Sequence, residues 1–467
     1  MLRVKMRWIQ LITIGTLALA CGTAVPPPSQ QPSHSTSTTA PSAAVAGAWA
    51  ESGHMAEPRG DGSTATRLAN GKVLVVGGEN ADTEIYDPGT GEFVATEDTT
   101  VVRLGHTATL LADGSVLVVG GFDGQKGIAS AELYDPASAS WTATGPLHDG
   151  RFQPTATLLE DGRVLIVAGW KTDAEYLATS EIYDPNTRSW SQAGVISDAR
   201  GYHGAVLLSD GTVLVAGGQN EDGALATAEL FDPATSSWTH LPGMAHARSY
   251  GSAVLLEDGR VLVAGGGAGD PRLQSAELFD PETQTWAEAA TMTEPRSQHV
   301  AVRLPDGRVL AAGGGETHKP TAELYDPTAD NWTQTGAMAS WRASPLVALL
   351  ADGRVFVGGG FADDATSTEL FDPTRGGPVA SVPPWFSRCE PGCQGPIIGA
   401  FTSNGFLPGL QLSLGDDDWF NSADYSEEIQ FERGDDVLRF WRNAGASSLT
   451  GSLLTDRIVS VGPAESD

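Results

Sequence analysis

The stretch Arg200-Gly-Tyr-His-Gly-Ala-Val-Leu-Leu208, with the following Ser209-Asp210-Gly211 and Val213-Leu-Val-Ala-Gly217-Gly218, decides the fold. Two short apolar runs are separated by Asp-Gly, and the second run ends in Gly-Gly. After a loop come Ala228-Glu-Leu-Phe-Asp232-Pro233 and then Trp238. Asp-Gly, Gly-Gly and Asp-Pro form turns, because glycine accepts a positive φ and proline fixes φ. The segment therefore predicts four short antiparallel strands, the last of which begins at the tryptophan.

The same pattern recurs seven times, with a period of about 43 to 49 residues. Its glycine pair occurs at Gly77, Gly120, Gly169 (after Ala168), Gly217, Gly265, Gly313 and Gly359. A Glu-aliphatic-aromatic-Asp-Pro element begins at Glu84, Glu132, Glu181, Glu229, Glu277, Glu323 and Glu369. Repeats of this length with four short strands each predict a β-propeller, in which every repeat is one blade.

The glycine pair and two spaced aromatic residues, as in Tyr134 and Trp141, resemble the kelch repeat. The resemblance covers residues 49–378 and implies an all-β fold, a seven-bladed kelch-type β-propeller. Residues 379–467 do not keep the period, and their alternating runs, such as 428–432, predict a small C-terminal β domain.

Trp49 indicates how the ring closes. Each tryptophan of the repeat is followed ten positions later by an arginine, as Trp238 is by Arg248. Trp49 keeps this spacing to Arg59 but has no blade of its own, and the seventh Asp-Pro element lacks its following aromatic residue. We therefore expect Trp49 to lie in the outer strand of blade seven, which closes the ring and removes an open sheet edge.

An arginine precedes the first strand of every repeat, at Arg59, Arg103, Arg151, Arg200, Arg248, Arg296 and Arg342. A residue that all copies share is a requirement of the blade, whereas a single binding site belongs where the copies differ. We expect these arginines to form ion pairs with the seven glutamates. The alternative is an anion-binding ring at the mouth of the central channel.

Residues 1–20 have the features of a signal peptide. Arg3, Lys5 and Arg7 precede an apolar run of about 12 residues, which is too short for a membrane span of ~20 residues. The run ends in Ala18-Leu-Ala-Cys21, which resembles the lipobox of bacterial lipoproteins and implies acylation of Cys21. The alternative is an ordinary signal peptide and a free Cys21. The segment 21–48, rich in Pro, Ser and Thr, predicts a tether.

The charge of the chain excludes two classes of partner. The 467 residues carry 58 acidic and 28 basic side chains, a formal charge of −30. Nucleic acid requires a basic face, and anionic lipid requires a polybasic segment. We therefore expect no nucleic-acid partner and membrane contact only through the lipid anchor. From the leader we expect export to the cell envelope, on the outer surface or in the periplasm. We expect the protein to be a monomer.

Two features of the C-terminal region concern cysteine and metal chemistry. Cys389-Glu-Pro-Gly-Cys393 predicts a local disulfide in an exported protein. The run Asp416–Asp418 with Asp424 has the ligand type for calcium, but its spacing is irregular, and a solvated acidic loop is the better interpretation.

Variation among the repeats concentrates in the loop after the glycine pair, which is longest in repeats two to five. Aromatic side chains beside carboxylates suit the recognition of sugars or peptides. The alternative is that these aromatic side chains pack on their own blades. The prediction is a protein- or glycan-binding module with a candidate contact surface at Phe122, Trp170, Tyr176, Tyr202, His203, Tyr250 and Asp270.

The pair Tyr202-His203 resembles a segment of the galactose-oxidase family, in which a Tyr-His pair on a seven-bladed kelch propeller ligates copper. That family also needs a tyrosine cross-linked to a cysteine and a histidine from the C-terminal domain. Here no histidine follows His318, and no cysteine lies between Cys21 and Cys389. We expect no cofactor, neither copper nor calcium. A copper-radical oxidase-like or other glycan-active enzyme is the alternative function.

Overall fold

The computed structural model describes residues 47–375, except Glu79, 173–174, 268–270 and 316–318, and in addition six strands between residues 401 and 461. The regular structure of the described residues is β-strand throughout. Among them, no helix has the length and apolar composition needed to cross a membrane.

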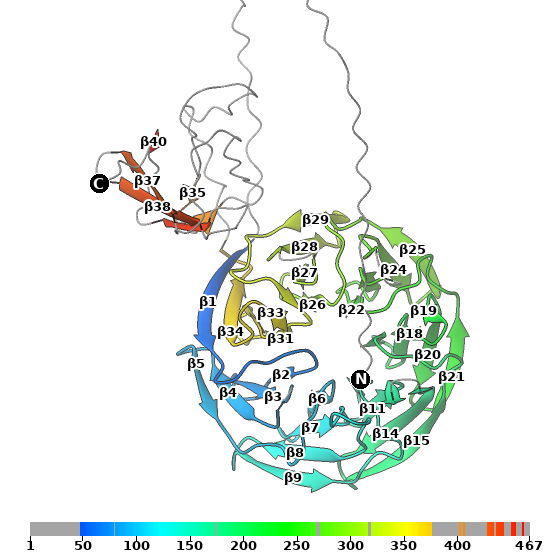
Figure 1. The fold of residues 1–467 in the computed structure, drawn as a ribbon. Coiled ribbons are helices and arrows are strands. Elements are labelled where there is room, and N and C mark those ends of the chain that lie inside the picture. Colours follow the sequence, from blue (N-terminus) through cyan, green and yellow to red (C-terminus); the bar gives the residue numbers. More distant parts are fainter. Residues whose placement is uncertain are drawn as a thin grey trace, which may run out of the picture. The chain divides into compact units, whose positions relative to one another are not determined.

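Residues 48–372 form seven four-stranded antiparallel sheets, which are the blades of a propeller (Figure 1). Blades one to three consist of β2 (Thr64–Arg67), β3 (Val73–Val76), β4 (Thr83–Asp87) and β5 (Glu92–Ala95); of β6 (Thr107–Leu110), β7 (Val116–Val119), β8 (Ala131–Asp135) and β9 (Ser140–Thr144); and of β10 (Thr155–Leu158), β11 (Val164–Val167), β14 (Thr179–Asp184) and β15 (Ser189–Val195).

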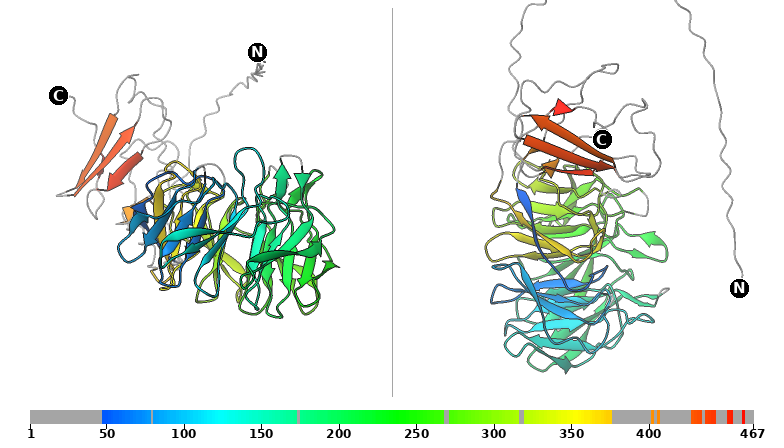
Figure 2. Two further views of the ribbon diagram at one scale, coloured as in Figure 1. Left: turned by 90° about the horizontal axis from the view of Figure 1, so that it is seen from below. Right: turned by 60° about the vertical axis from the view of Figure 1, so that its left-hand side comes forward.

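Blades four to six consist of β16 (Gly204–Leu207), β17 (Val213–Ala216), β20 (Ala228–Asp232) and β21 (Ser237–Leu241); of β22 (Ser252–Leu255), β23 (Val261–Ala264), β24 (Ala276–Asp280) and β25 (Thr285–Ala289); and of β26 (Val300–Arg303), β27 (Val309–Ala312), β28 (Ala322–Asp326) and β29 (Asn331–Gln334). Blade seven contains β31 (Leu346–Leu349), β32 (Val355–Gly358), β34 (Ser367–Asp372) and β1 (Ala48–His54). The first strand of each blade contacts that of the next, and β31 contacts β2, so the innermost strands form a closed ring around the central axis (Figure 1). Figure 2 shows the blades from two further sides.

Blade four shows why the repeat folds in this way. All four residues of β17, Val213–Ala216, are buried, because both faces of a blade pack against its neighbours. The turn between β16 and β17 is made by Asp210, whose Oδ1 accepts the N–H of Thr212, and by Gly211, whose φ of 83° favours glycine. The turn formers of the sequence thus occupy the turns of the blade.

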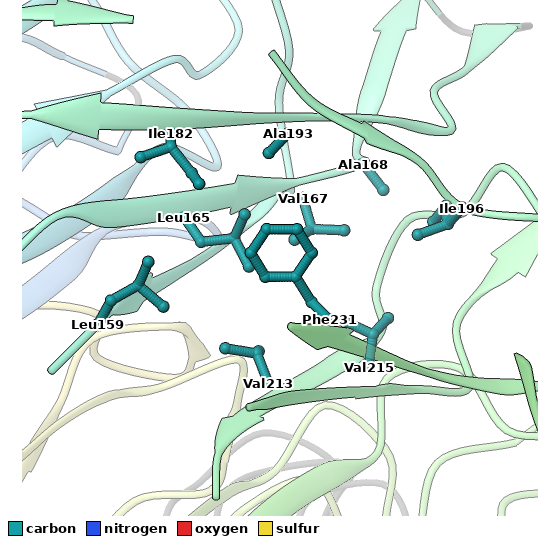
Figure 3. Close-up of a cluster of buried hydrophobic side chains, with 10 residues drawn as sticks. All are labelled: Leu159, Leu165, Val167, Ala168, Ile182, Ala193, Ile196, Val213, Val215 and Phe231. Atoms are coloured by element: carbon teal, nitrogen blue, oxygen red, sulfur yellow. The ribbon is translucent and has the colours of Figure 1, made fainter. Parts of the chain in front are cut away.

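Apolar clusters between neighbouring blades hold the ring together. Between blades three and four, Leu165 and Val167 of β11 pack with Val213 and Val215 of β17 around the ring of Phe231 (Figure 3). Complete burial of an apolar side chain of this size stabilises the fold by about 1.5–3 kcal/mol. The propeller therefore has a series of cores, one at each interface between blades.

The N-terminal strand completes blade seven, at the position that the tryptophan spacing predicts for Trp49. In the antiparallel pair of β1 and β34, Trp49 is opposite Phe371 and Ala48 is opposite Asp372. The ring centroids of Trp49 and Phe371 are 5.0 Å apart, and Trp49 Nε1 donates a hydrogen bond to Thr335 Oγ1 in blade six. The strand β1, which precedes blade one in the sequence, is thus the outer strand of blade seven.

We expect Trp49→Ala to lower the stability of the propeller by about 2–3 kcal/mol, because a half-buried indole and its ring contact are lost. Hydrogen exchange at β34 should increase, since β1 no longer covers it. The matched control is Trp141→Ala, because Trp141 makes the equivalent 5.0 Å contact with Tyr134 inside a continuous blade. Thermal unfolding and hydrogen exchange measure both effects; an unchanged melting midpoint would show that blade seven closes without Trp49.

The C-terminal region contains further antiparallel strands. β35 (Phe401–Thr402) pairs with β36 (Gly405–Phe406). β37 (Glu427–Arg433), β38 (Asp436–Arg442), β39 (Thr450–Leu453) and β40 (Ser460–Val461) form a sheet of order β39-β38-β37-β40. The alternating run at 428–432 lies in β37, as its pattern predicts. The predicted disulfide cysteines Cys389 and Cys393 and the acidic run Asp416–Asp418 lie outside the described residues.

Candidate functional site

In every blade the arginine before the first strand pairs with the glutamate of the third strand. The Nη2–Oε distances are between 2.7 and 3.5 Å, and all fourteen side chains are buried. In blade four, Arg200 Nη1 also donates to the carbonyls of Gly217 and Thr227. The glutamates in turn accept backbone N–H groups of the loop that enters the blade, as Glu229 accepts that of Ser197. The arginine–glutamate prediction is therefore confirmed. These guanidinium groups are engaged in the fold and do not form an anion-binding ring.

The loops that precede the first strand of each blade and the loops that follow the glycine pair lie on one rim of the propeller. The residues before the first strand form antiparallel bridges with the loop after the glycine pair, at Leu104 and Phe122, Phe152 and Trp170, and Gly201 and Gln219. Two of these loops fold into small ladders, β12 (Trp170–Thr172) with β13 (Glu175–Tyr176) and β18 (Gln219–Asn220) with β19 (Gly223–Ala224). A third ladder joins β30 (Arg342–Ala343) to β33 (Phe361–Ala362). The variable loops thus lie beside the central axis.

Seven residues encircle the axis at this rim, each two positions before an innermost strand. We call them the axial ring: Gly62, Gly105, Gln153, Tyr202, Tyr250, Gln298 and Ser344. All have a positive φ, between 49° and 76°. The backbone N–H groups of Gly105, Gln153, Tyr250, Gln298 and Ser344 each donate to the carbonyl of the equivalent residue in the preceding blade. The left-handed conformation costs non-glycine residues of order 1–3 kcal/mol each, which these hydrogen bonds help to offset.

A continuous series of aromatic rings lies on this rim. We call it the aromatic crescent: Phe122, Phe152, Trp170, Tyr176, Tyr202 and Tyr250. From blade two to blade five, successive ring centroids are 5.1 Å (Phe122–Phe152), 5.5 Å (Phe152–Trp170), 5.5 Å (Trp170–Tyr202) and 3.9 Å (Tyr202–Tyr250) apart. Tyr176 packs on Trp170 at 4.2 Å. The rings come from four blades, and each is half-buried.

The structure therefore brings together five of the seven predicted site residues: Phe122, Trp170, Tyr176, Tyr202 and Tyr250. The sequence analysis missed Phe152, which links Phe122 to Trp170. A comparison of the residues that follow the seven arginines would have found it, because Phe152 is the aromatic member of that set. Asp270 lies outside the described residues.

His203 does not belong to this surface, and its inclusion among the rim residues is wrong. The side chain is buried between blades three and four, and its Nε2 is hydrogen-bonded to Thr155 Oγ1 at 2.8 Å. Burial, and secondarily the charge of Arg200, lower the pKa of His203 to about 3. His106 and His299 make the same 2.8 Å contact with hydroxyls of the preceding blade, Thr64 and Ser252. These three histidines are structural connections between blades.

Asp61 contributes a carboxylate at the axis. The loop that enters blade one is one residue longer than the others, and Asp61 occupies it beside the axial-ring residue Gly62. Burial raises the pKa of Asp61, although its carboxylate accepts a hydrogen bond from Ser344. Burial also raises the pKa of Tyr202 and of Tyr250, and the negative charge of Asp61 adds to both shifts. The charge of the Asp61 carboxylate therefore acts on both phenols.

The donor set of this site does not fit copper. The imidazole of His203, the histidine that the resemblance implies as a ligand, lies in an interface between blades with Nε2 hydrogen-bonded to Thr155. Tyr202 is hydrogen-bonded to Tyr250. No cysteine lies between Cys21 and Cys389 that could be cross-linked to a second tyrosine of the propeller. Within the part of the chain that the structure describes, no three His, Cys, Asp or Glu side chains are grouped as metal ligands. Two phenols and a carboxylate without imidazole make a poor copper site.

Comparisons with known proteins agree with this architecture. Residues 105–314 match the KLHDC2/KLHL20/DRC7 Kelch-repeats domain. Among solved structures, a fungal alcohol oxidase of the AA5 family in complex with copper is similar with a TM-score of 0.58 and 18% identity, over 86% of this chain and 85% of that chain. The structure of YjhT is similar with a TM-score of 0.48 and 15% identity, over 61% of this chain and 99% of that chain.

A search of curated protein sequences found no match to this chain. At 18% identity, the likeness to the alcohol oxidase shows the fold alone. Residues 48–372 therefore form a seven-bladed β-propeller, of which residues 105–314 match a kelch-repeat domain.

Proposed function

We propose that the propeller is a binding module for a protein or glycan ligand, and that the aromatic crescent is its contact surface. The observation that carries this proposal is the continuous series of half-buried rings from Phe122 to Tyr250, whose successive centroids are 3.9–5.5 Å apart.

The fold itself does not require tyrosine at these positions. Blades one and two have Gly62 and Gly105 in the axial ring, and Gly105 makes the same hydrogen bond to the preceding blade that Tyr250 makes. Glycine adopts this conformation without strain. The ring hydrogen bonds therefore do not explain why these two positions carry tyrosine. Large, rigid and half-exposed aromatic rings are the side chains that dominate contact energies at binding surfaces.

An array of glycans and peptides probed with the full chain tests the proposal. We expect Trp170→Ala and Tyr202→Gly to reduce the signal of the bound ligand at least about tenfold, the effect of losing one central aromatic contact. Trp170→Ala removes a half-buried indole with three ring contacts and should lower the melting midpoint, so binding is compared at a temperature at which thermal unfolding shows every variant to be folded. Phe361→Ala is the matched control, because Phe361 is an exposed aromatic residue of blade seven on the same rim, outside the crescent. Equal signals from all four proteins would contradict the proposal.

We also propose that the module is exported and anchored through a lipid on Cys21, which lies outside the described residues. The lipobox-like Ala18-Leu-Ala-Cys21 and the basic, then apolar, leader support this proposal. Cys21→Ser should move the protein from the membrane fraction to the soluble fraction, because no acyl chain can attach. Fractionation and immunoblotting measure the change, and equal partitioning of variant and parent would rule out acylation as the anchor.

A further inference from the structure

Carboxylates are the charged side chains that act on the phenols of the aromatic crescent. Asp61 precedes Gly62 of the axial ring and accepts a hydrogen bond from Ser344, which is linked through Gln298 to Tyr250 by the ring hydrogen bonds. Its charge adds to the effect of burial, which raises the pKa of Tyr202 and of Tyr250. Glu221, which is exposed, has the same effect on Tyr176. The described part of this surface thus combines aromatic faces with negative charge.

The basic side chains of blades three to five on this rim are engaged by other residues of the propeller. Arg151, Arg200 and Arg248 are buried against glutamates. Lys171 Nζ is 3.2 Å from Asp149 Oδ1 and 3.7 Å from Glu175 Oε1. Arg272 Nη1 donates to the backbone carbonyl of Gly314 at 2.9 Å. These cations are held by other partners and do not neutralise Asp61 or Glu221. Lys126 in the loop of Phe122 is exposed, and its charge acts on the neighbouring carboxylate of Asp123.

We infer that the aromatic crescent receives a cationic side chain, a lysine or arginine of a protein partner, between its tyrosine faces and the Asp61 carboxylate. The inference rests on the proposed function and names the ligand class. The negative face of an aromatic ring attracts a cation within about 6 Å of its centroid. A carboxylate adds direct charge complementarity, and the chain's formal charge of −30 steers a basic partner towards it. A neutral sugar would leave this charge uncompensated.

Calorimetric titration of the full chain with two peptides tests the inference. The peptides have one sequence with three lysines, and in the second peptide the lysines are acetylated, which removes the charge and keeps the length. We expect the lysine peptide to bind at least about tenfold more tightly than the acetylated peptide. The difference should shrink as the salt concentration rises, because screening weakens exposed charge interactions.

Four variants locate the site. Tyr250→Leu keeps an apolar side chain but removes the π face, and Asp61→Asn removes the charge while keeping a group that can hydrogen-bond Ser344. Each should weaken binding of the lysine peptide about fivefold to tenfold. Tyr250→Phe keeps the face and should bind within about twofold of the parent. Glu160→Gln removes one exposed carboxylate beside the Asp-Gly turn at the opposite rim and should also stay within about twofold.

The outcomes separate this inference from the proposed function. Equal binding of both peptides, with both sensitive to Tyr250→Leu, overturns the cationic ligand but supports the crescent as a contact surface. So does a neutral glycan that competes for the crescent while the lysine peptide does not bind. Equal weakening by Glu160→Gln and Asp61→Asn shows diffuse charge attraction and overturns the inference. Binding that neither Tyr250→Leu nor Trp170→Ala changes, in folded variants, overturns both proposals.

Discussion

Lowering the pH from 7 to 4.5 is expected to destabilise the propeller by several kcal/mol through His106, His203 and His299. Burial, and secondarily nearby arginines, lower the pKa of each imidazole from 6.5 to about 3 in the folded chain. Since the folded pKa lies below the unfolded pKa, the unfolded chain binds more protons between these values. The stability is complete above pH 6.5 and is lost as the pH falls towards about 3. Each histidine accounts for up to about 1.4 kcal/mol per pH unit in this window.

A matched pair of variants isolates this effect. In His299→Gln, the glutamine retains a polar group for Ser252 but does not titrate, so the decrease in stability between pH 6.5 and 4.5 should become shallower by one histidine. His240 is exposed, and His240→Gln is the matched control, in which a surface histidine is replaced in the same way. Denaturant unfolding at a series of pH values measures the free energy of unfolding. Parallel curves for the parent and His299→Gln would show that His299 is not a buried neutral imidazole.

Arg296→Ala is expected to cost about 3–5 kcal/mol, because it leaves a buried carboxylate without its cation. Arg296 and Glu323 are the most completely buried of the seven pairs, with both side chains 0% exposed. The guanidinium also donates to the carbonyls of Gly313 and Thr321, so its loss leaves further buried acceptors unpaired. The variant therefore removes both the ion pair with Glu323 and the hydrogen bonds that hold the loop after the glycine pair.

The control for Arg296→Ala is Arg308→Ala. Arg308 pairs with Asp306 at the opposite rim, where both side chains are partly exposed to water. Exposed pairs contribute about 0–1 kcal/mol, so the melting midpoint should change little. Thermal and denaturant unfolding of the two variants gives the comparison. Similar losses would show that burial does not set the value of the seven pairs.

Most of the propeller could be predicted from the sequence, because its turns use residues with few alternatives. Asp210-Gly211 and Gly217-Gly218 occupy positions where positive φ is required, and their spacing fixed the length of each strand. The position of Trp49 is predicted by its spacing to Arg59, because the seventh repeat lacks a fourth strand and the N-terminal segment can supply it. The arginine–glutamate pairs followed from their presence in every copy. A residue that is present in all seven copies meets a physical requirement of the blade, and its role can therefore be predicted.

The site was less predictable, because it depends on the direction of single side chains. Tyr202 and His203 are adjacent, but Tyr202 lies at the axis and His203 in an interface between blades, so the pair does not act together. Phe152 and Asp61 belong to the site through interactions with residues of other loops and blades. The sequence of one repeat does not predict such interactions. Departure from the consensus identified Tyr202 and Tyr250 correctly as residues of the rim, but it could not show which neighbours they meet.

The register of β1 on β34 has a mechanical consequence. The chain enters the propeller at Ala48 and leaves it just after Asp372, and these residues are opposite partners in one antiparallel pair. A pulling force applied between the two flanking segments would act on the same end of this pair. It would part the strands one hydrogen bond at a time, as in unzipping, rather than load all of them together in shear. Tension on the flanking segments would therefore open the propeller at the β1–β34 pair, the same pair that closes the ring.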